Sequence, residues 1–205
     1  MAAEDVIPLP QRESAAVEAT VRSVVSPGAT LTGNRRRELA MAVRDAADGQ
    51  GATAPDQEEA LARHFTNAAH TIRAHHVSEA LKAGMTAARY VEILSLAARV
   101  SAVDTMCFGL GVEAVPFPAP IDGPPTDTVD PEAQFNQGWV PTVGPASPPN
   151  ALSLLPHDDE AMHQLHGALY LSIPEMAETD MERGLHRTQM ELVAARTSLL
   201  NECFF

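Results

Sequence analysis

The 205-residue chain has few aromatic side chains, few cysteines and few positive charges. Phe, Trp and Tyr make up 4% of it, and the alternating runs of Val, Ile, Thr and Tyr that mark strands are nearly absent. This composition argues against a β-sandwich and, with its abundant alanine, favours an all-α fold. The two cysteines, Cys107 and Cys203, are too few for a disulfide framework.

Positive charge is scarce, with 14 Lys and Arg against 27 Asp and Glu and a net charge of −13. Because nucleic-acid binding normally needs a basic face, we expect no nucleic-acid partner. The sequence contains no signal peptide and no uninterrupted apolar stretch of about 18 residues, the length needed to span a membrane. We therefore expect a soluble, cytoplasmic protein with no membrane partner.

Hydrophobic periodicity and Gly/Pro punctuation predict a series of helices. Ten of the sixteen prolines fall in residues 114–150, so we expect an irregular arm over the surface there. We expect Gly84 to end the third helix as a left-handed C′ residue. The predicted helices cover 11–25, 34–48, 56–82, 87–111, 158–171, a short segment in 174–183, and 187–200. The last of these is expected to bury Met190, Val193, Thr197 and Leu200.

The last nineteen residues, RTQMELVAARTSLLNECFF, carry the strongest functional signal. Glu191 lies twelve residues before Cys203, about 18 Å along a straight helix, so the two can cooperate only across a turn or between subunits. If Asn201 caps a new helix, Cys203 falls in its first turn, where unpaired N–H groups favour a thiolate. The alternative is a small buried cysteine at a frayed helix end.

The segment ELVAARTSLLNECFF resembles the active-site segment of the carboxymuconolactone decarboxylase / alkylhydroperoxidase D (AhpD)-like superfamily. Its members carry a Glu on one helix, an Asn-containing turn, CxxC, and a His four residues beyond the second Cys. Glu191, Asn201 and Cys203 match this pattern in order and spacing. The second Cys of the pattern would fall immediately after Phe205.

The amino-terminal half resembles the same family in a degenerate form. LTGNRRREL resembles the start of the Glu-bearing helix, with Glu38 as the matching Glu. HHVSEALKAGMT resembles the segment that follows CxxC, with His76 as the matching His. Gln50, or Ala69 in the other alignment, stands where the first cysteine belongs, so this half is expected to lack redox cysteines.

The resemblance implies a duplicated all-α fold. It divides the chain into a tail and helix (1–33), a first repeat without redox cysteines (34–113), a Pro-rich arm (114–150), and a second repeat that ends at the redox motif (151–205). The arm, with the stretch VDTMCFGLGVEAVPFPAP that leads into it, is similar to a two-repeat branch of the superfamily in which only the second repeat carries the redox pair.

The same resemblance implies an antioxidant oxidoreductase that reduces hydroperoxides with a thiol or selenol. Cys203 and Glu191 would form its site. Cys203 would either attack the peroxide or resolve the oxidised first residue to a disulfide, and AhpD-like proteins suggest the resolving role. We expect a homo-oligomer, dimeric or trimer-based, and a thioredoxin-like or lipoyl protein as reductant, with no cofactor. Without its second redox residue the 205-residue chain is expected to turn over poorly, either as a truncation or because UGA encodes selenocysteine there.

Two other functions remain open from the sequence. One is a non-catalytic helical oligomer kept for binding or assembly. The other is a carboxymuconolactone decarboxylase-type lyase that uses Glu38 and His76 as acid and base. A metal site on Glu160, His163 and His166 is a further possibility from spacing alone, but we expect no metal because the additional Glu residues of a di-iron bundle are missing.

Overall fold

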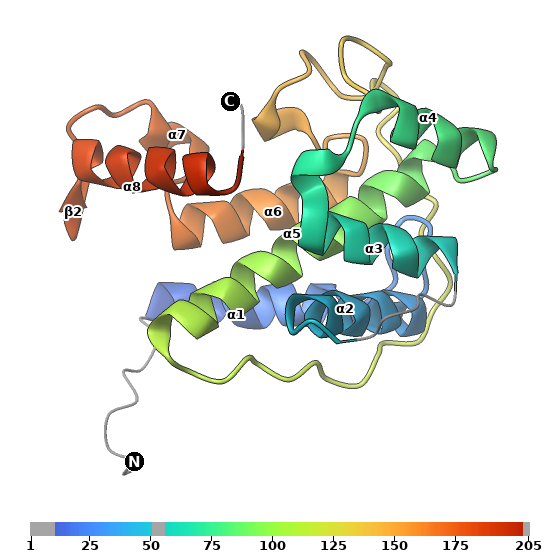
Figure 1. Cartoon of the computed structure of the whole chain (residues 1–205), viewed down its shortest axis with the longest axis horizontal. Helices are drawn as coiled ribbons and strands as arrows, with labels where there is room; N and C mark the ends of the chain where they lie inside the picture. The colour runs from blue at the N-terminus through green and yellow to red at the C-terminus, as the bar shows by residue number, and fades with distance from the viewer. Residues whose placement is uncertain (1–10, 51–55, 203–205) are drawn as a thin grey trace.

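The computed structural model describes residues 11–50 and 56–202, and this part of the chain is all-α (Figure 1). Within it the only strands are β1 (Glu182–Arg183) and β2 (Leu185–His186), a two-residue antiparallel hairpin. Two short 3-10 turns, η1 (Ala69–Thr71) and η2 (Pro148–Asn150), complete the elements. The helices are α1 (Gln11–Ser23), α2 (Gly33–Ala47), α3 (Gln57–Ala68), α4 (Ala74–Lys82), α5 (Ala87–Leu110), α6 (Pro156–Leu169), α7 (Ile173–Met176) and α8 (Arg187–Leu200).

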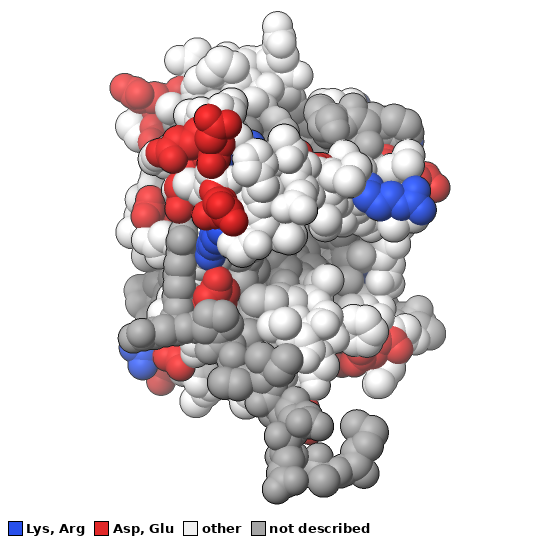
Figure 2. Space-filling model, turned by 90° about the vertical axis from the view of Figure 1, so that its left-hand side faces the viewer, with Lys and Arg blue, Asp and Glu red and all other residues white. Residues whose placement is uncertain are grey.

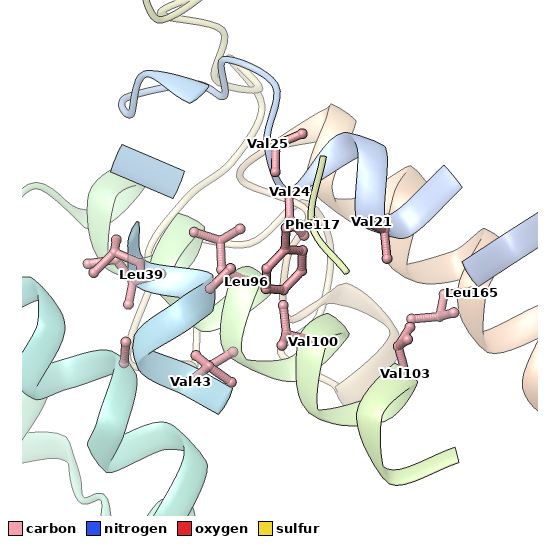
Figure 3. Close-up of a cluster of buried hydrophobic side chains, with 14 of the residues drawn as sticks. Val21, Val24, Val25, Leu39, Val43, Leu96, Val100, Val103, Phe117 and Leu165 are labelled. Atoms are coloured by element: carbon pink, nitrogen blue, oxygen red, sulfur yellow. The ribbon is translucent and has the colours of Figure 1, made fainter. Parts of the chain in front are cut away.

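Helix α5 is the central element, and α1, α2, α3 and α6 pack around it (Figure 1). Its first turn is capped by Thr86, whose side chain accepts a hydrogen bond from the Arg89 amide, and it ends at Gly111 in the left-handed conformation. The core between these elements is aliphatic (Figure 3). It includes Val21 of α1, Val24 of the turn that follows α1, Leu39 and Val43 of α2, Leu96, Val100 and Val103 of α5, Leu165 of α6, and Phe117 of the arm.

By length and composition α5 is the one helix in the described residues that could cross a membrane. Its contacts are those of a central core helix, however. Glu92 and Arg99 are fully buried on it, and both form ion pairs or hydrogen bonds with neighbouring elements inside the protein. The two buried charges are paired with Arg36 of α2 and Asp158 of α6. The other buried residues of α5 are mostly apolar because they lie in the protein core.

The predicted helix over 56–82 is wrong as one element, because the chain breaks into α3, η1 and α4. At the break the Thr71 hydroxyl donates to the Ala68 carbonyl, and Arg73 takes an extended conformation as the N-cap of α4. A side chain that competes for a helix carbonyl favours termination over continuation. The end of this segment is as predicted, with Gly84 left-handed at φ 101°.

The Pro-rich arm between α5 and η2 is irregular and ordered, as its composition predicts. It crosses the α1–α2 side of the molecule, where the Ile121 amide donates to the Val25 carbonyl at 2.9 Å. Phe117 is buried there, and the guanidinium of Arg44 lies 3.7 Å from the centre of its ring. The arm is therefore fastened by backbone hydrogen bonds to the segment between α1 and α2, and by this cation–π contact to α2.

Helix α8 has the predicted bounds but buries a different face. Met190 is buried, whereas Val193 and Leu200 are 58% and 67% exposed, and Thr197 is also exposed. The more covered positions are 187, 190, 194 and 198, which follow a helical stripe offset from the predicted one.

The structure establishes the all-α class but does not show the expected duplication: α7 has only 4 residues.

Candidate functional site

Glu191, the candidate carboxylate, lies in the middle of α8 and is held by two neighbours. Its Oε1 accepts a hydrogen bond from the Tyr170 hydroxyl at 2.6 Å and from Arg187 Nε at 2.6 Å. Arg187 is one turn back on the same helix, and Tyr170 is at the carboxyl end of α6. The carboxylate is thus fixed in direction while it remains about half exposed to solvent.

Arg183 positions the Tyr170 end of α6. From the β1–β2 hairpin its guanidinium donates to the carbonyls of Gly167, Ala168 and Tyr170, and it also pairs with Glu13 of α1 at 3.0 Å. These carbonyls belong to the last turn of α6, where a cation is favoured by the helix dipole. One arginine therefore joins α1, α6 and the hairpin that leads into α8.

The hydrogen bond between Tyr170 and Glu191 shifts the pKa of both groups away from neutral pH. Donation from the Tyr170 hydroxyl, with the help of Arg187, holds the pKa of Glu191 below its ordinary value even though burial acts the other way. Burial, together with the neighbouring carboxylate, raises the pKa of Tyr170. At neutral pH the pair is therefore a phenol donor facing a carboxylate acceptor, an arrangement that can orient a proton acceptor.

Asn201 ends α8, and the prediction that it caps a following helix is not what its geometry shows. Its φ and ψ are −93° and 9°, outside the extended region of an N-cap, and its Nδ2 donates back to the Thr197 carbonyl at 2.9 Å. Glu202 then adopts a left-handed φ of 55°. The chain thus turns at Asn201 and Glu202. Cys203 itself lies outside the described residues.

The two candidate residues of the first half lie in separate surroundings. Glu38 is exposed on α2 and pairs with Arg35 at 2.9 Å. His76 completes the capping box of α4, where its Nδ1 accepts from the Arg73 amide at 3.0 Å. No contact in the described residues joins Glu38 to His76. The structure therefore gives both residues local structural roles and offers no support for an acid–base pair.

The Glu160, His163 and His166 series does not converge on one point. Glu160 accepts from Gln164 at 2.6 Å, His163 Nε2 lies 2.9 Å from the Pro149 carbonyl, and His166 Nδ1 lies 2.7 Å from the Leu171 carbonyl. In residues 11–50 and 56–202 there is no group of three His, Cys, Asp or Glu side chains that could hold a metal ion. Glu160 and His163 instead line an open cleft of about 480 Å³ between α1, α6 and α7.

Four charged side chains that were not predicted from the sequence form a buried cluster between α2, α5 and α6. Arg36 pairs with Glu92 at 2.5 Å and with Asp158 at 3.1 Å, and Arg99 pairs with the same oxygen of Asp158 at 2.5 Å. All four are at most 3% exposed. Ser95 adds a hydroxyl that donates to Asp158 at 2.9 Å. We call Arg36, Glu92, Arg99 and Asp158 the buried charge cluster.

The buried charge cluster is balanced, with two cations and two anions. Burial alone would raise the pKa of Asp158, but the guanidiniums of Arg36 and Arg99 hold it below its ordinary value. Burial lowers the pKa of Arg99 to about 10 against the attraction of Asp158. Arg36, Arg99 and Asp158 therefore remain charged at neutral pH. Because the cluster is closed to solvent, it joins α2, α5 and α6 as a structural element and leaves no charge for a ligand.

One sequence signal could have revealed part of this cluster. Glu92 and Arg99 stand seven residues apart, two turns on the same face of a helix that is otherwise strongly apolar. Charges on a buried face are paired or absent. No sequence signal distinguishes Asp158 as a buried charge. It belongs to the acidic run Asp158-Asp159-Glu160, which is typical of the first turn of a helix.

Cys107 is 1% exposed and lies in the apolar core.

Comparison of the chain with models of known protein families, with curated proteins and with solved structures finds no match.

Proposed function

We propose that this chain is an AhpD-like, thiol- or selenol-dependent peroxidase whose redox site is at the carboxyl end of α8. The observation that carries the proposal is the arrangement on α8. A carboxylate, Glu191, is held by a phenol and an arginine, and the helix that bears it ends at Asn201, two residues before Cys203 in the sequence. The motif order and the all-α fold also support the proposal.

The proposed chemistry uses two redox atoms. A thiolate or selenolate attacks the hydroperoxide, which forms an S–O or Se–O bond, breaks the O–O bond and releases an alkoxide that takes a proton. The resulting sulfenic or selenenic acid is attacked by the second sulfur, which gives a disulfide or selenenylsulfide and water. Cys203 supplies the resolving sulfur, and Glu191 belongs to the proton relay. A cytoplasmic dithiol protein, thioredoxin-like or lipoyl, restores the reduced pair.

The test uses the chain extended by a single cysteine after Phe205, which completes CxxC. We expect this extended chain to reduce cumene hydroperoxide with a dithiol as the electron source, whereas the 205-residue chain shows little turnover. In the extended chain, Glu191→Gln should lower the rate by about a hundredfold, the usual contribution of a general acid–base group. Turnover is followed by loss of hydroperoxide, and oxidation of the pair by mass spectrometry.

Two controls separate this result from background thiol chemistry. Cys203→Ser in the extended chain should abolish disulfide formation, and Cys107→Ser should leave the rate unchanged because Cys107 is buried in the core. The proposal is wrong if the extended chain oxidises no faster than the free dithiol, or if Glu191→Gln and Cys203→Ser do not alter the rate.

A second candidate function, a helical oligomer kept for assembly, is favoured by the outer face of α8. Leu192, Leu199 and Leu200 are 72%, 67% and 67% exposed there, and Val193 is exposed beside them. Figure 2 shows that the end of the molecule bearing α7 and the hairpin has acidic side chains gathered along one side of a wide uncharged surface. Exposed leucines at helical spacing are typical of a face that packs against another helix.

We expect the protein to be larger than its 21.9 kDa monomer in light scattering coupled to size exclusion. The double variant Leu192→Ser with Leu199→Ser should shift it toward the monomer, because it removes two leucines that face the same way on α8. Val129→Ser, which alters a 45% exposed valine of the arm, is the matched control and should leave the mass unchanged. A wild-type monomer at micromolar concentration would refute assembly through α8.

A further inference from the structure

Four histidines gather where α3 turns through η1 into α4. The rings of His64 and His76 are 5.7 Å apart, edge to face, and those of His75 and His76 are 3.9 Å apart. His70 lies on η1 between the two helices. We call His64, His70, His75 and His76 the histidine corner. Together they are half of the eight histidines of the chain.

Hydrogen bonds assign part of the proton pattern in the corner. The Thr71 hydroxyl donates to the Ala68 carbonyl, so toward His64 Nε2, at 2.7 Å, it acts as an acceptor, and the His64 proton is on Nε2. The Arg73 amide donates to His76 Nδ1 at 3.0 Å. That nitrogen must keep its lone pair for the bond to exist. Protonation of His76 therefore breaks the capping box at the start of α4.

The charges around the corner oppose protonation. Burial, with His76 and His70 nearby, lowers the pKa of His64. The guanidinium of Arg73 is fixed at the carbonyls of His70, at 2.5 Å, and Ile72, at 2.8 Å, and adds a permanent positive charge. The carboxylate in contact with the corner is Glu202, 3.9 Å from His70 Nε2, and Glu79 is the next acidic residue along α4. Full protonation would thus place five cations, the four imidazoliums and Arg73, beside one contacting carboxylate.

We propose that the histidine corner is a pH-sensitive hinge that holds α4 against α3 when its imidazoles are neutral and opens in mild acid. Two effects act together on acidification. The cap of α4 is lost when Nδ1 of His76 takes a proton, and the imidazolium groups of His64, His75 and His76 repel one another. Opening separates α3 from α4 and exposes the small apolar cluster beneath them, in which Val77 packs against Leu61 and Phe65.

The direction of the pH effect follows from linkage. The pKa of His64 is lower in the folded protein than the value of about 6.5 for an unfolded chain. The open form therefore binds more protons than the closed one, so the closed form is favoured above this pH and loses stability as the pH falls through the folded value. The hinge is thus closed near neutral pH and opens over the range below about 6.5.

Hydrogen exchange of the amides of residues 69–80 tests the hinge, measured at pH 7.5 and 5.5 and corrected for the intrinsic pH dependence of exchange. We expect the opening constant to rise in acid by up to about tenfold per pH unit for each proton taken up. The amides of Arg73 and His76, which are bonded across the cap, should show the rise, while core amides of α5 should not.

His76→Gln is the decisive variant. Glutamine at the third position of a helix can accept from the N-cap amide as histidine does here, but it cannot be protonated. The variant should keep the protection of α4 at pH 7.5 and lose most of its acid sensitivity, and the NMR titration of His64 should move to higher pH. His157→Gln, at an exposed histidine of α6, is the matched control and should behave as wild type. Equal acid sensitivity in wild type and His76→Gln would overturn the proposal, as would wild-type protection that does not change with pH.

Discussion

Asp158→Asn is expected to lower the free energy of unfolding by about 3–5 kcal/mol, the usual cost of removing one partner from a buried ion pair. Asp158 Oδ1 accepts from Arg36 at 3.1 Å, from Arg99 at 2.5 Å and from Ser95 at 2.9 Å. Asparagine keeps the size and one acceptor oxygen but removes the negative charge. Two buried guanidiniums would then share Glu92 as their one anionic partner in the cluster. Urea unfolding followed by circular dichroism measures the loss.

Asp159→Asn provides the matched control, since it is the same change one residue further along α6. Asp159 is only half-buried, and burial, together with Glu160, raises its pKa, so its charge is not favoured by its surroundings. We expect this variant to lie within about 1 kcal/mol of wild type, because the charge interacts mainly with the helix dipole and His163. If both variants lose the same stability, the buried charge cluster does not have the role assigned to it.

Asp158 also makes the stability of the fold depend on pH in a known direction. The pKa of Asp158 is lower in the folded protein than the value of about 3.9 for an unfolded chain. Its contribution to stability is therefore fully present above that unfolded value and is lost as the pH falls through the folded one. Below about pH 4 the wild type should lose stability more steeply than Asp158→Asn, which has no proton to gain there.

The sequence predicted the elements whose ends carry explicit local signals. The helix over 87–111 begins after Thr86 and ends at a glycine, and both signals are used in the structure. The helix predicted at about 187–200 is present as α8, Arg187–Leu200. Helix bounds depend on caps and glycines that act within one turn, so a single sequence contains the information needed to place them.

The errors concern features that the apolar pattern of a segment does not determine, whether their cause is a distant contact or a local side-chain hydrogen bond. The face of α8 could not be found from its own pattern, because Leu192, Val193, Leu199 and Leu200 are apolar yet exposed. The break before α4 depends on Thr71 and Arg73, whose side chains bind backbone carbonyls, as many helix-interior side chains do without ending a helix. The candidate site divides in the same way. Glu191 was predicted through the family resemblance of its segment, whereas its partner Tyr170, at the end of α6, was not predicted.

Gly33→Ala is expected to cost about 2–3 kcal/mol of stability, the upper part of the usual range for overpacking. Gly33 is the buried first residue of α2, beneath the point where the arm bonds to the end of the α1 segment. A methyl group there would lie 2.4 Å from the carbonyl oxygen of Ile121 and 2.4 Å from that of Val25. Both are backbone atoms, so neither can rotate away, and the arm must lift from α1 and α2.

The control for this change is Gly109→Ala, in the last turn of α5, where an added methyl group meets no atom within 4 Å. This variant should be neutral or slightly stabilising, because alanine favours a helix by up to about 1 kcal/mol over glycine. Thermal unfolding compares the two, and a lifted arm should also speed proteolysis within residues 114–130 in Gly33→Ala alone. Equal melting temperatures for the two variants would mean that the arm is not fastened at Gly33. The arm would then pass over α2 without restraining it, and its course would not depend on the absence of a side chain at Gly33.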